Sequence, residues 1–280
     1  HAGPPRQYVY GIRDRMAERY DAVRVVRDAK HQYLRNFMPH LTWSQWVSYT
    51  EEMPTMKAWR ALAAAGKLNP VQARYFQPTK PREELYDLAA DPHQVRNLAG
   101  LPEHQATLLR MRAECLRWMN ETHDLGLLPE YELRERSAAS TPWEIAADPA
   151  MNPLPRLLEA AGVANAMDPA NLPQLVDLLR ADDSAVRCWG ALGLVALKAQ
   201  ARPAAQDLHK ALADASPSVR VAAAEAVAQL GQPERALPVL IAALEHDSAI
   251  VRLMAMKDRK STSLNSSHVR HTPMPTSACK

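Results

Sequence analysis

The segment EELYDLAADPHQVRNLA, residues 83–99, gathers most of the residue types that acid–base chemistry uses. Three carboxylates, those of Glu83, Glu84 and Asp87, precede an Asp-Pro pair, and a histidine and an asparagine follow it. Carboxylates and a histidine can act as general acid and base or bind a metal ion. The same spacing also fits a short strand that ends in a turn, so the segment supports two interpretations.

The Asp-Pro pair favours the structural interpretation. Asp91 can accept hydrogen bonds from the free amides of a following helical turn, as N-cap residues do. Pro92 suits the first helical position, where a missing N–H is no loss. Gln94 stands three residues after the cap, where it can complete a capping box. We therefore expect residues 83–99 to be scaffold, a strand followed by a capped turn.

Two further groups of residues could do chemistry. Arg13 and Arg15 alternate along the first expected strand, so their guanidinium groups could clamp a sulfate or a carboxylate; pairing with neighbouring acids is the alternative. Glu121, His123 and Asp124 stand together, but at a helix C-terminus, where a capping or surface role is the commoner one. The sequence thus offers Arg13 and Arg15 as candidate substrate-binding residues and offers no catalytic residue.

Signatures of a metal or nucleotide site are absent from the sequence. The histidines form no HxH or HExxH motif, and no GxxxxGK[ST], GxGxxG or GxSxG motif occurs. Cys115, Cys188 and Cys279 have no CxxC spacing, which excludes a disulfide framework and a zinc knuckle and favours buried free thiols. We expect no metal site and no cofactor in these 280 residues.

A small α+β unit must position the candidate residues. Alternation at Tyr8, Tyr10 and Ile12 predicts a half-buried strand. The next two β-rich segments, 20–28 and 31–37, are close enough to form an antiparallel hairpin.

Helical segments come next. Residues 43–67 look helical, and a short strand is expected at 84–88. A long helix from Pro102 to about His123, closed by Gly126, carries an apolar stripe. The stripe consists of Leu108, Met111, Cys115 and Met119.

The second half of the chain repeats itself. Val-Arg pairs end at Arg187, Arg220 and Arg252, 33 and 32 residues apart, and each follows an apolar helix and an Asp-containing turn. A two-helix unit at this period is typical of an α-solenoid, and it resembles HEAT repeats over about residues 171–256. The resemblance implies an extended surface for a protein partner. The third unit is truncated, so we expect its apolar residues Leu240, Ile241 and Leu244 to be poorly covered.

The first half also resembles a known family. The stretches YVYGIRDRMAERYDAVRVVRDAKHQYLRNF, EELYDLAADPHQVRNLA and RWMNETHDLGLLPE resemble the C-terminal region of bacterial sulfatases of the N-sulfoglucosamine sulfohydrolase (sulfamidase) type. The resemblance covers residues 1–146 and implies a small antiparallel sheet and a long helix, packed on an alkaline-phosphatase-like catalytic core. In this family the core carries a formylglycine, made from a C/S-x-P-x-R motif, and a calcium ion.

No C/S-x-P-x-R motif occurs in the chain, and the first residue is His1 rather than Met. We therefore expect the catalytic core, with calcium and formylglycine, to precede this chain in a longer protein. The resemblance implies that the whole protein hydrolyses sulfuric ester or sulfamate bonds of a sulfated carbohydrate. It also implies a periplasmic or extracellular location and an inactive chain in isolation. The alternative is a non-enzymatic HEAT scaffold with a degenerate sulfatase-like lobe.

Composition narrows the partners. Charged residues make up 23% of the chain, and no apolar run approaches the length of about 18 residues that a membrane span needs. The net charge of +3 resides wholly in residues 258–280, which resemble a translated sequencing adapter, DRKSTRLNSSH, with Ser263 as the difference. We expect this tail to be an artefact and disordered, and we expect neither a nucleic-acid nor a membrane partner. The predicted organisation is a sulfatase-like α+β subdomain at 1–146, a proline-rich connector at 147–170, an all-α HEAT solenoid at 171–257 and the tail at 258–280.

Overall fold

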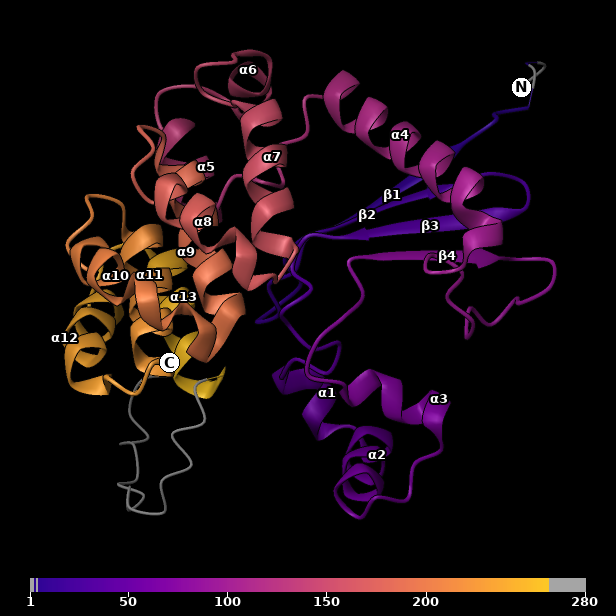
Figure 1. The fold of residues 1–280 in the computed structure, drawn as a ribbon, viewed down its shortest axis with the longest axis horizontal. Helices are drawn as coiled ribbons and strands as arrows, with labels where there is room; N and C mark the ends of the chain where they lie inside the picture. The colour runs from indigo at the N-terminus through magenta and orange to yellow at the C-terminus, as the bar shows by residue number, and fades with distance from the viewer. Residues whose placement is uncertain (1–2, 4, 262–280) are drawn as a thin grey trace, which may run out of the picture.

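The computed structural model describes residue 3 and residues 5–261, which form a small sheet lobe beside a stack of helices (Figure 1). The sheet is antiparallel, with the strand order β1-β2-β3-β4. The strands are β1 (Val9–Arg13), β2 (Val23–Arg27), β3 (His31–Asn36) and β4 (Glu83–Asp87). The expected hairpin is confirmed, because β2 pairs with β3 and the Asp28 carboxylate accepts hydrogen bonds from the N–H groups of Lys30 and His31 in the turn.

Strand β1 lies at the edge of the sheet, and its expected buried face is only partly covered. Tyr10 stacks on Trp118 with ring centroids 4.8 Å apart. Ile12, two residues further along, is 64% exposed. The covering helix ends at Glu121, less than one turn after Trp118, so it does not reach Ile12.

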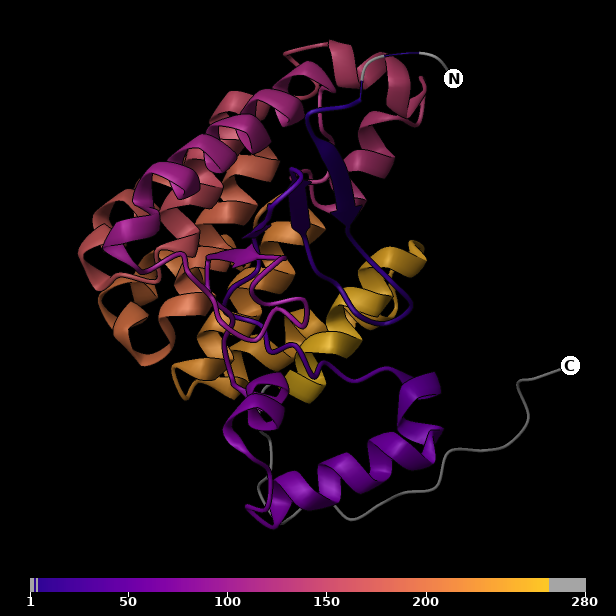
Figure 2. The ribbon, with the colours of Figure 1, turned by 90° about the vertical axis from the view of Figure 1, so that its right-hand side faces the viewer.

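Three short helices connect β3 to β4 and stand apart from the rest of the molecule (Figure 2). They are α1 (Ser48–Glu52), α2 (Pro54–Ala64) and α3 (Pro70–Ala73). The helical prediction over 43–67 is therefore confirmed from Ser48 onward, with a break before Pro54.

Helix α4 (Gln105–Glu121) lies across the sheet and buries the predicted stripe of Leu108, Met111, Cys115 and Met119. The helix ends before His123, whose φ of 51° leaves the helical region. Gly126 is therefore not the residue that closes it. A Cβ at Gly126 would lie 1.7 Å from Nη2 of Arg24, so this position needs glycine for close packing.

The helical stack begins earlier than expected. Helices α5 (Glu130–Arg136) and α6 (Pro142–Ala147) precede α7 (Leu154–Asn165), which lies inside the segment 147–170. Its small residues Ala160, Ala161 and Ala164 are buried, and α7 packs closely against α9. The three repeated units follow as α8 (Leu172–Leu178) with α9 (Ser184–Leu197), α10 (Ala205–Ala211) with α11 (Pro217–Gln229), and α12 (Pro233–Leu244) with α13 (Ala249–Ser261).

The repeated arginines stabilise the turn inside each helix pair by hydrogen bonds. Nη1 of Arg187, Arg220 and Arg252 donates to the carbonyl oxygens five and six residues earlier, at 2.6–2.9 Å. Arg187 also forms an ion pair with Asp214 of the next unit at 2.8 Å. Each arginine thus satisfies carbonyl groups that the end of a helix would leave without partners.

The last unit is better covered than predicted at one position. Ile241 is 55% exposed, as expected, but Leu240 is only 9% exposed because it joins the core, and Leu244 is partly buried. Helix α13 runs to Ser261, into the segment expected to be disordered. Residues 262–280, including Cys279, lie outside the described part of the chain.

One hydrophobic core runs through both parts of the molecule. The cluster of buried side chains extends from Ala22 in the sheet lobe to Ala255 in α13 without a break. At the junction, Nε1 of Trp189 donates to the carbonyl oxygen of Leu127 at 2.9 Å. The sheet lobe and the repeats are therefore packed against each other.

Candidate functional site

The acid-rich segment of residues 83–99 is occupied by structural contacts. Glu83 accepts hydrogen bonds from Nε and Nη2 of Arg112, both at 2.6 Å, and from the Tyr33 hydroxyl. Glu84 accepts a hydrogen bond from the side-chain amide of Asn36 at 2.7 Å. These carboxylates hold β3, β4 and α4 together, which agrees with the scaffold interpretation.

The turn that follows differs in detail from the prediction. Asp91 accepts a hydrogen bond from the N–H of Arg96 at 2.8 Å, but residues 91–94 form a turn and no helix starts there. Gln94 has a φ of 55° and accepts a hydrogen bond from the side chain of Gln32 instead of completing a capping box. The turn capped by Asp91 is therefore confirmed, whereas the capping box with Gln94 and a helix starting at Pro92 are wrong.

The second acidic group is also structural. Asp124 accepts a hydrogen bond from Nη2 of Arg24 at 2.7 Å, and Arg24 donates to Asp14 at 2.8 Å. Arg24 is 1% exposed. Burial alone would lower its pKa, but the two carboxylates outweigh burial and raise it. Glu121 pairs instead with Arg117 on the helix surface, so these acids do not form one site.

The two candidate substrate-binding arginines have different surroundings. Arg15 donates two hydrogen bonds to Glu130, at 2.6 and 2.7 Å, and its guanidinium lies 5.1 Å from the ring centroid of Tyr20. Arg13 keeps Nε and Nη2 buried, with no hydrogen bond to any residue that the structure describes. Burial lowers the pKa of Arg13, and the charge of Arg19 adds to this effect.

Arg13 belongs to a basic cluster that the sequence did not reveal. We give this name to Arg13, Arg19 and Lys80, because Arg13 lies close enough to both of the others for their charges to interact. Nζ of Lys80 lies 2.6 Å from Asp21, with both side chains buried. Burial lowers the pKa of Lys80, and Arg13 contributes in the same direction, while Asp21 and Glu84 oppose it.

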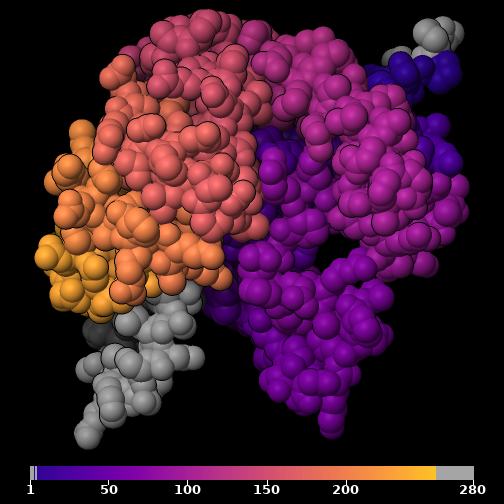
Figure 3. Space-filling view, viewed as in Figure 1, coloured from indigo at the N-terminus to yellow at the C-terminus, as the bar shows by residue number. Residues whose placement is uncertain are grey.

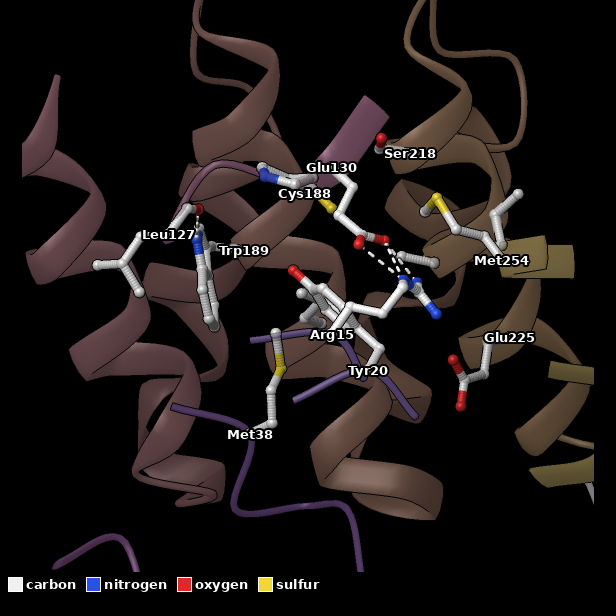
Figure 4. Close-up of a pocket in the computed structure, with 14 residues that line it drawn as sticks. Arg15, Tyr20, Met38, Leu127, Glu130, Cys188, Trp189, Ser218, Glu225 and Met254 are labelled. Atoms are coloured by element: carbon white, nitrogen blue, oxygen red, sulfur yellow. Dashed lines mark hydrogen bonds and ion pairs between the residues drawn. The ribbon is translucent and has the colours of Figure 1, made fainter. Parts of the chain in front are cut away.

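A small cavity lies where the sheet lobe meets the repeats (Figure 4). It measures about 60 Å³ and is lined by Tyr20 and Met38 on one side and by Trp189 and Met254 on the other. The Arg15–Glu130 ion pair also borders it. Such a volume holds a few water molecules and no organic substrate.

A buried carboxylate on α5 links this helix to the repeats. Glu132 of α5 is 6% exposed and accepts hydrogen bonds from the hydroxyls of Ser184 and Ser216, which start α9 and α11. Arg136, one turn further along α5, pairs with Asp183 at 2.9 Å. The segment EYELRER does not predict these contacts, because its alternating charges are typical of a solvent-exposed helix.

The described residues do not fit the metal and the modified residue that the family resemblance implies. Among residues 3 and 5–261, no group of three or more His, Cys, Asp or Glu side chains could hold a metal ion. Cys115 and Cys188 are buried, neither stands in a C-x-P-x-R motif, and burial raises the pKa of Cys115 to about 12. No helix in the described part of the chain is long and apolar enough to cross a bilayer.

Comparison with known proteins finds one family model and two similar proteins. Residues 172–257 match the family model of HEAT repeats. The chain is also similar to two proteins of Formosa agariphila named ulvan-active sulfatase. The first is 40% identical over 128 residues, which is 46% of this chain and 22% of the relative. The second is 29% identical over 129 residues, 42% of this chain and 22% of the relative.

The chain spans about a fifth of the length of these relatives. It therefore combines a region of sulfatase-like origin with a HEAT-repeat region, and the four-stranded sheet with α4 is consistent with a sulfatase C-terminal subdomain.

Proposed function

We propose that this chain is the accessory lobe, with an attached docking arm, of a sulfatase that hydrolyses sulfuric esters. The observation that carries the proposal is the 40% identity to an ulvan-active sulfatase over 128 residues. In the proposal the catalytic residues, with calcium and formylglycine, lie in a core outside these 280 residues. The finer resemblance to the sulfamidase type, with hydrolysis of sulfamates, is the second possibility to assay.

The chain's own contribution would come from the sheet lobe and the repeats. Arg13 has donors without partners, which supports its proposed role in holding a substrate anion beside the core. Arg15 would have to exchange Glu130 for the substrate. The HEAT repeats would dock a protein partner. The substrate would be a sulfated carbohydrate, for which the names of the relatives make ulvan the first to test, in the periplasm or outside the cell.

The test starts with the complete reading frame. We expect the long protein to release sulfate from ulvan, measured by ion chromatography, and the 280-residue chain alone to release none. In the long protein, Arg13→Gln should raise KM about tenfold or more, because a charge-assisted hydrogen bond contributes about 1.5–3 kcal/mol. Arg27→Gln, an exposed change in the same sheet, is the control.

Two results would contradict the proposal. One is sulfate release by the 280-residue chain without an added core. The other is a complete reading frame without a C/S-x-P-x-R motif, which would favour the non-enzymatic scaffold.

A further inference from the structure

A groove of about 680 Å³ opens between the sheet lobe and the first long helix of the stack. Strands β3 and β4 form its floor, while α4 and α7 form its walls. The space-filling view shows a hollow between the magenta surface of α4 and the salmon surface of α7 (Figure 3). Its volume is in the range of small-molecule sites, about 300–1,000 Å³, and is too large for a single ion.

Arg35 on the floor of the groove is a buried cation without a hydrogen-bonded counter-ion among the described residues. It is 9% exposed, and its side chain makes no hydrogen bond or ion pair with the residues that the structure describes. Its guanidinium lies 5.1 Å from the ring centroid of Phe37, which supports it from one side. Glu83 stands directly opposite in the strand pairing, but its oxygens already accept hydrogen bonds from Arg112.

A second arginine of the groove, Arg82, also lacks an anionic partner among the described residues. Arg82 lines the groove and is exposed, and its side chain forms no hydrogen bond or ion pair with the residues that the structure describes. The other carboxylate in the lining, Glu159, is exposed on α7. A buried charge without hydrogen bonds is costly. Burial lowers the pKa of Arg35, and the charges of Arg82 and Arg112 add to this effect, while Tyr33 and the charge of Glu83 oppose it. A bound anion would supply the hydrogen bonds that the Arg35 guanidinium lacks.

We propose that the groove binds an anionic saccharide. Arg35 and Arg82 hold a sulfate group of the ligand, since guanidinium groups match tetrahedral anions with paired hydrogen bonds. Leu116 and Leu158, also in the lining, contact the sugar ring. The anion site follows from the geometry, whereas the choice of a sulfated sugar rests on the proposed function.

The ligand class is tested by calorimetry on the 280-residue chain with three probes. These are a sulfated oligosaccharide prepared from ulvan, the same oligosaccharide after chemical desulfation, and sodium sulfate. We expect the first to bind at least about tenfold more tightly than either of the others, because only it engages both the arginines and the apolar wall. Equal binding of the desulfated probe, equal binding of sodium sulfate, or no binding of the sulfated probe overturns the proposal.

Two variants test the residues. Arg35→Met and Arg82→Gln should each weaken the sulfated probe about 10- to 100-fold. Arg27→Gln on β2 removes an exposed arginine that has no hydrogen bond or ion pair among the described residues, and should change nothing. Arg35→Met should fold, because it removes an unpaired buried charge, and Arg82 is exposed, so its replacement leaves the core intact.

Unchanged affinity in both arginine variants overturns the proposal. The calorimetry measures binding and not hydrolysis. Absence of binding would therefore not contradict sulfate release by the long protein. A long protein that releases no sulfate would remove the reason for choosing a sulfated sugar, whereas the calorimetry would still test the anion site, so the two failures can be told apart.

Discussion

Glu83 and Arg35 face each other across paired strands, yet their contacts differ. Glu83 accepts hydrogen bonds from Arg112 and Tyr33, while the Arg35 side chain packs against the ring of Phe37 and makes no hydrogen bond with a described residue. The acid that looks catalytic in the sequence is thus fully occupied, and an arginine that looked like an ordinary strand residue retains its donors. At the scale of single residues, a side chain whose hydrogen bonds are all made within the protein is structural, and one that lacks such partners is a candidate binding residue.

Stability at low pH should report the role of Glu83. Burial by itself would raise the pKa of Glu83, but hydrogen bonds from Arg112 and Tyr33 hold it below its ordinary value. A carboxylate with a lowered folded-state pKa stabilises the fold above its unfolded pKa of about 4.3, and this contribution is lost as the pH falls through the folded value. We expect Glu83→Gln to lower the free energy of unfolding by about 1–3 kcal/mol at neutral pH. We also expect the free energy of unfolding of this variant to fall less steeply as the pH is lowered.

Urea unfolding between about pH 3 and pH 7 measures this effect. Glu159→Gln removes an exposed carboxylate from the opposite wall of the groove and serves as the control. If the stability of Glu83→Gln followed that of the unchanged protein in parallel at every pH, the assigned role would be wrong.

At the scale of helices and strands, the helix pairs of the repeats share one feature, an arginine that donates hydrogen bonds to the turn between the two helices. Each repeated arginine closes the turn between its two helices through a pair of carbonyl oxygens, and Arg187 alone of the three also has an ion pair to a carboxylate of the next unit among the described residues. The second and third arginines therefore act within a unit, and the first also joins two units.

This difference can be measured. Arg220→Met should lower the free energy of unfolding by about 1.5–3 kcal/mol, because two carbonyl oxygens lose a charged donor. Arg187→Met should cost about 1 kcal/mol more, because it also leaves Asp214 without its ion pair. Arg202→Met, at an exposed position, is the control. Equal stabilities of the Arg187 and Arg220 variants in urea unfolding would argue against the link between units.

Local patterns predicted a large part of these elements. The β2–β3 hairpin, the buried stripe of α4 and the repeated helix pairs all follow from periodicity and turn chemistry, which are properties of neighbouring residues. The groove was not predictable, because Arg35 and Leu158 come together only when α7 packs beside the sheet. The same holds for Gly126, whose need for close approach depends on Arg24, about a hundred residues away.

At the scale of the whole molecule, the two parts behave as one packed body. The core is continuous, Trp189 donates to Leu127 across the junction, and Glu132 accepts hydrogen bonds from the starts of α9 and α11. The packing therefore continues across the boundary inferred from sequence motifs, and the chain is helical on both sides of it.

We expect a single calorimetric unfolding transition for the chain. Glu132→Ala should lower its midpoint temperature by several degrees, because the buried hydroxyl of Ser216 and the partly buried hydroxyl of Ser184 lose their acceptor, and a buried donor without a partner costs about 1–3 kcal/mol. Arg134→Ala changes an exposed residue on the same helix and should leave the midpoint unchanged. Two well-separated transitions in the unchanged protein would show that the parts unfold independently.

The unbroken core also sets where the gene can be divided for expression. A cut after residue 146 would separate Leu127 and Leu128 from Trp189. Both fragments would then expose hydrophobic surface that chaperones and proteases recognise. A soluble half-length product should therefore be harder to obtain than the full chain.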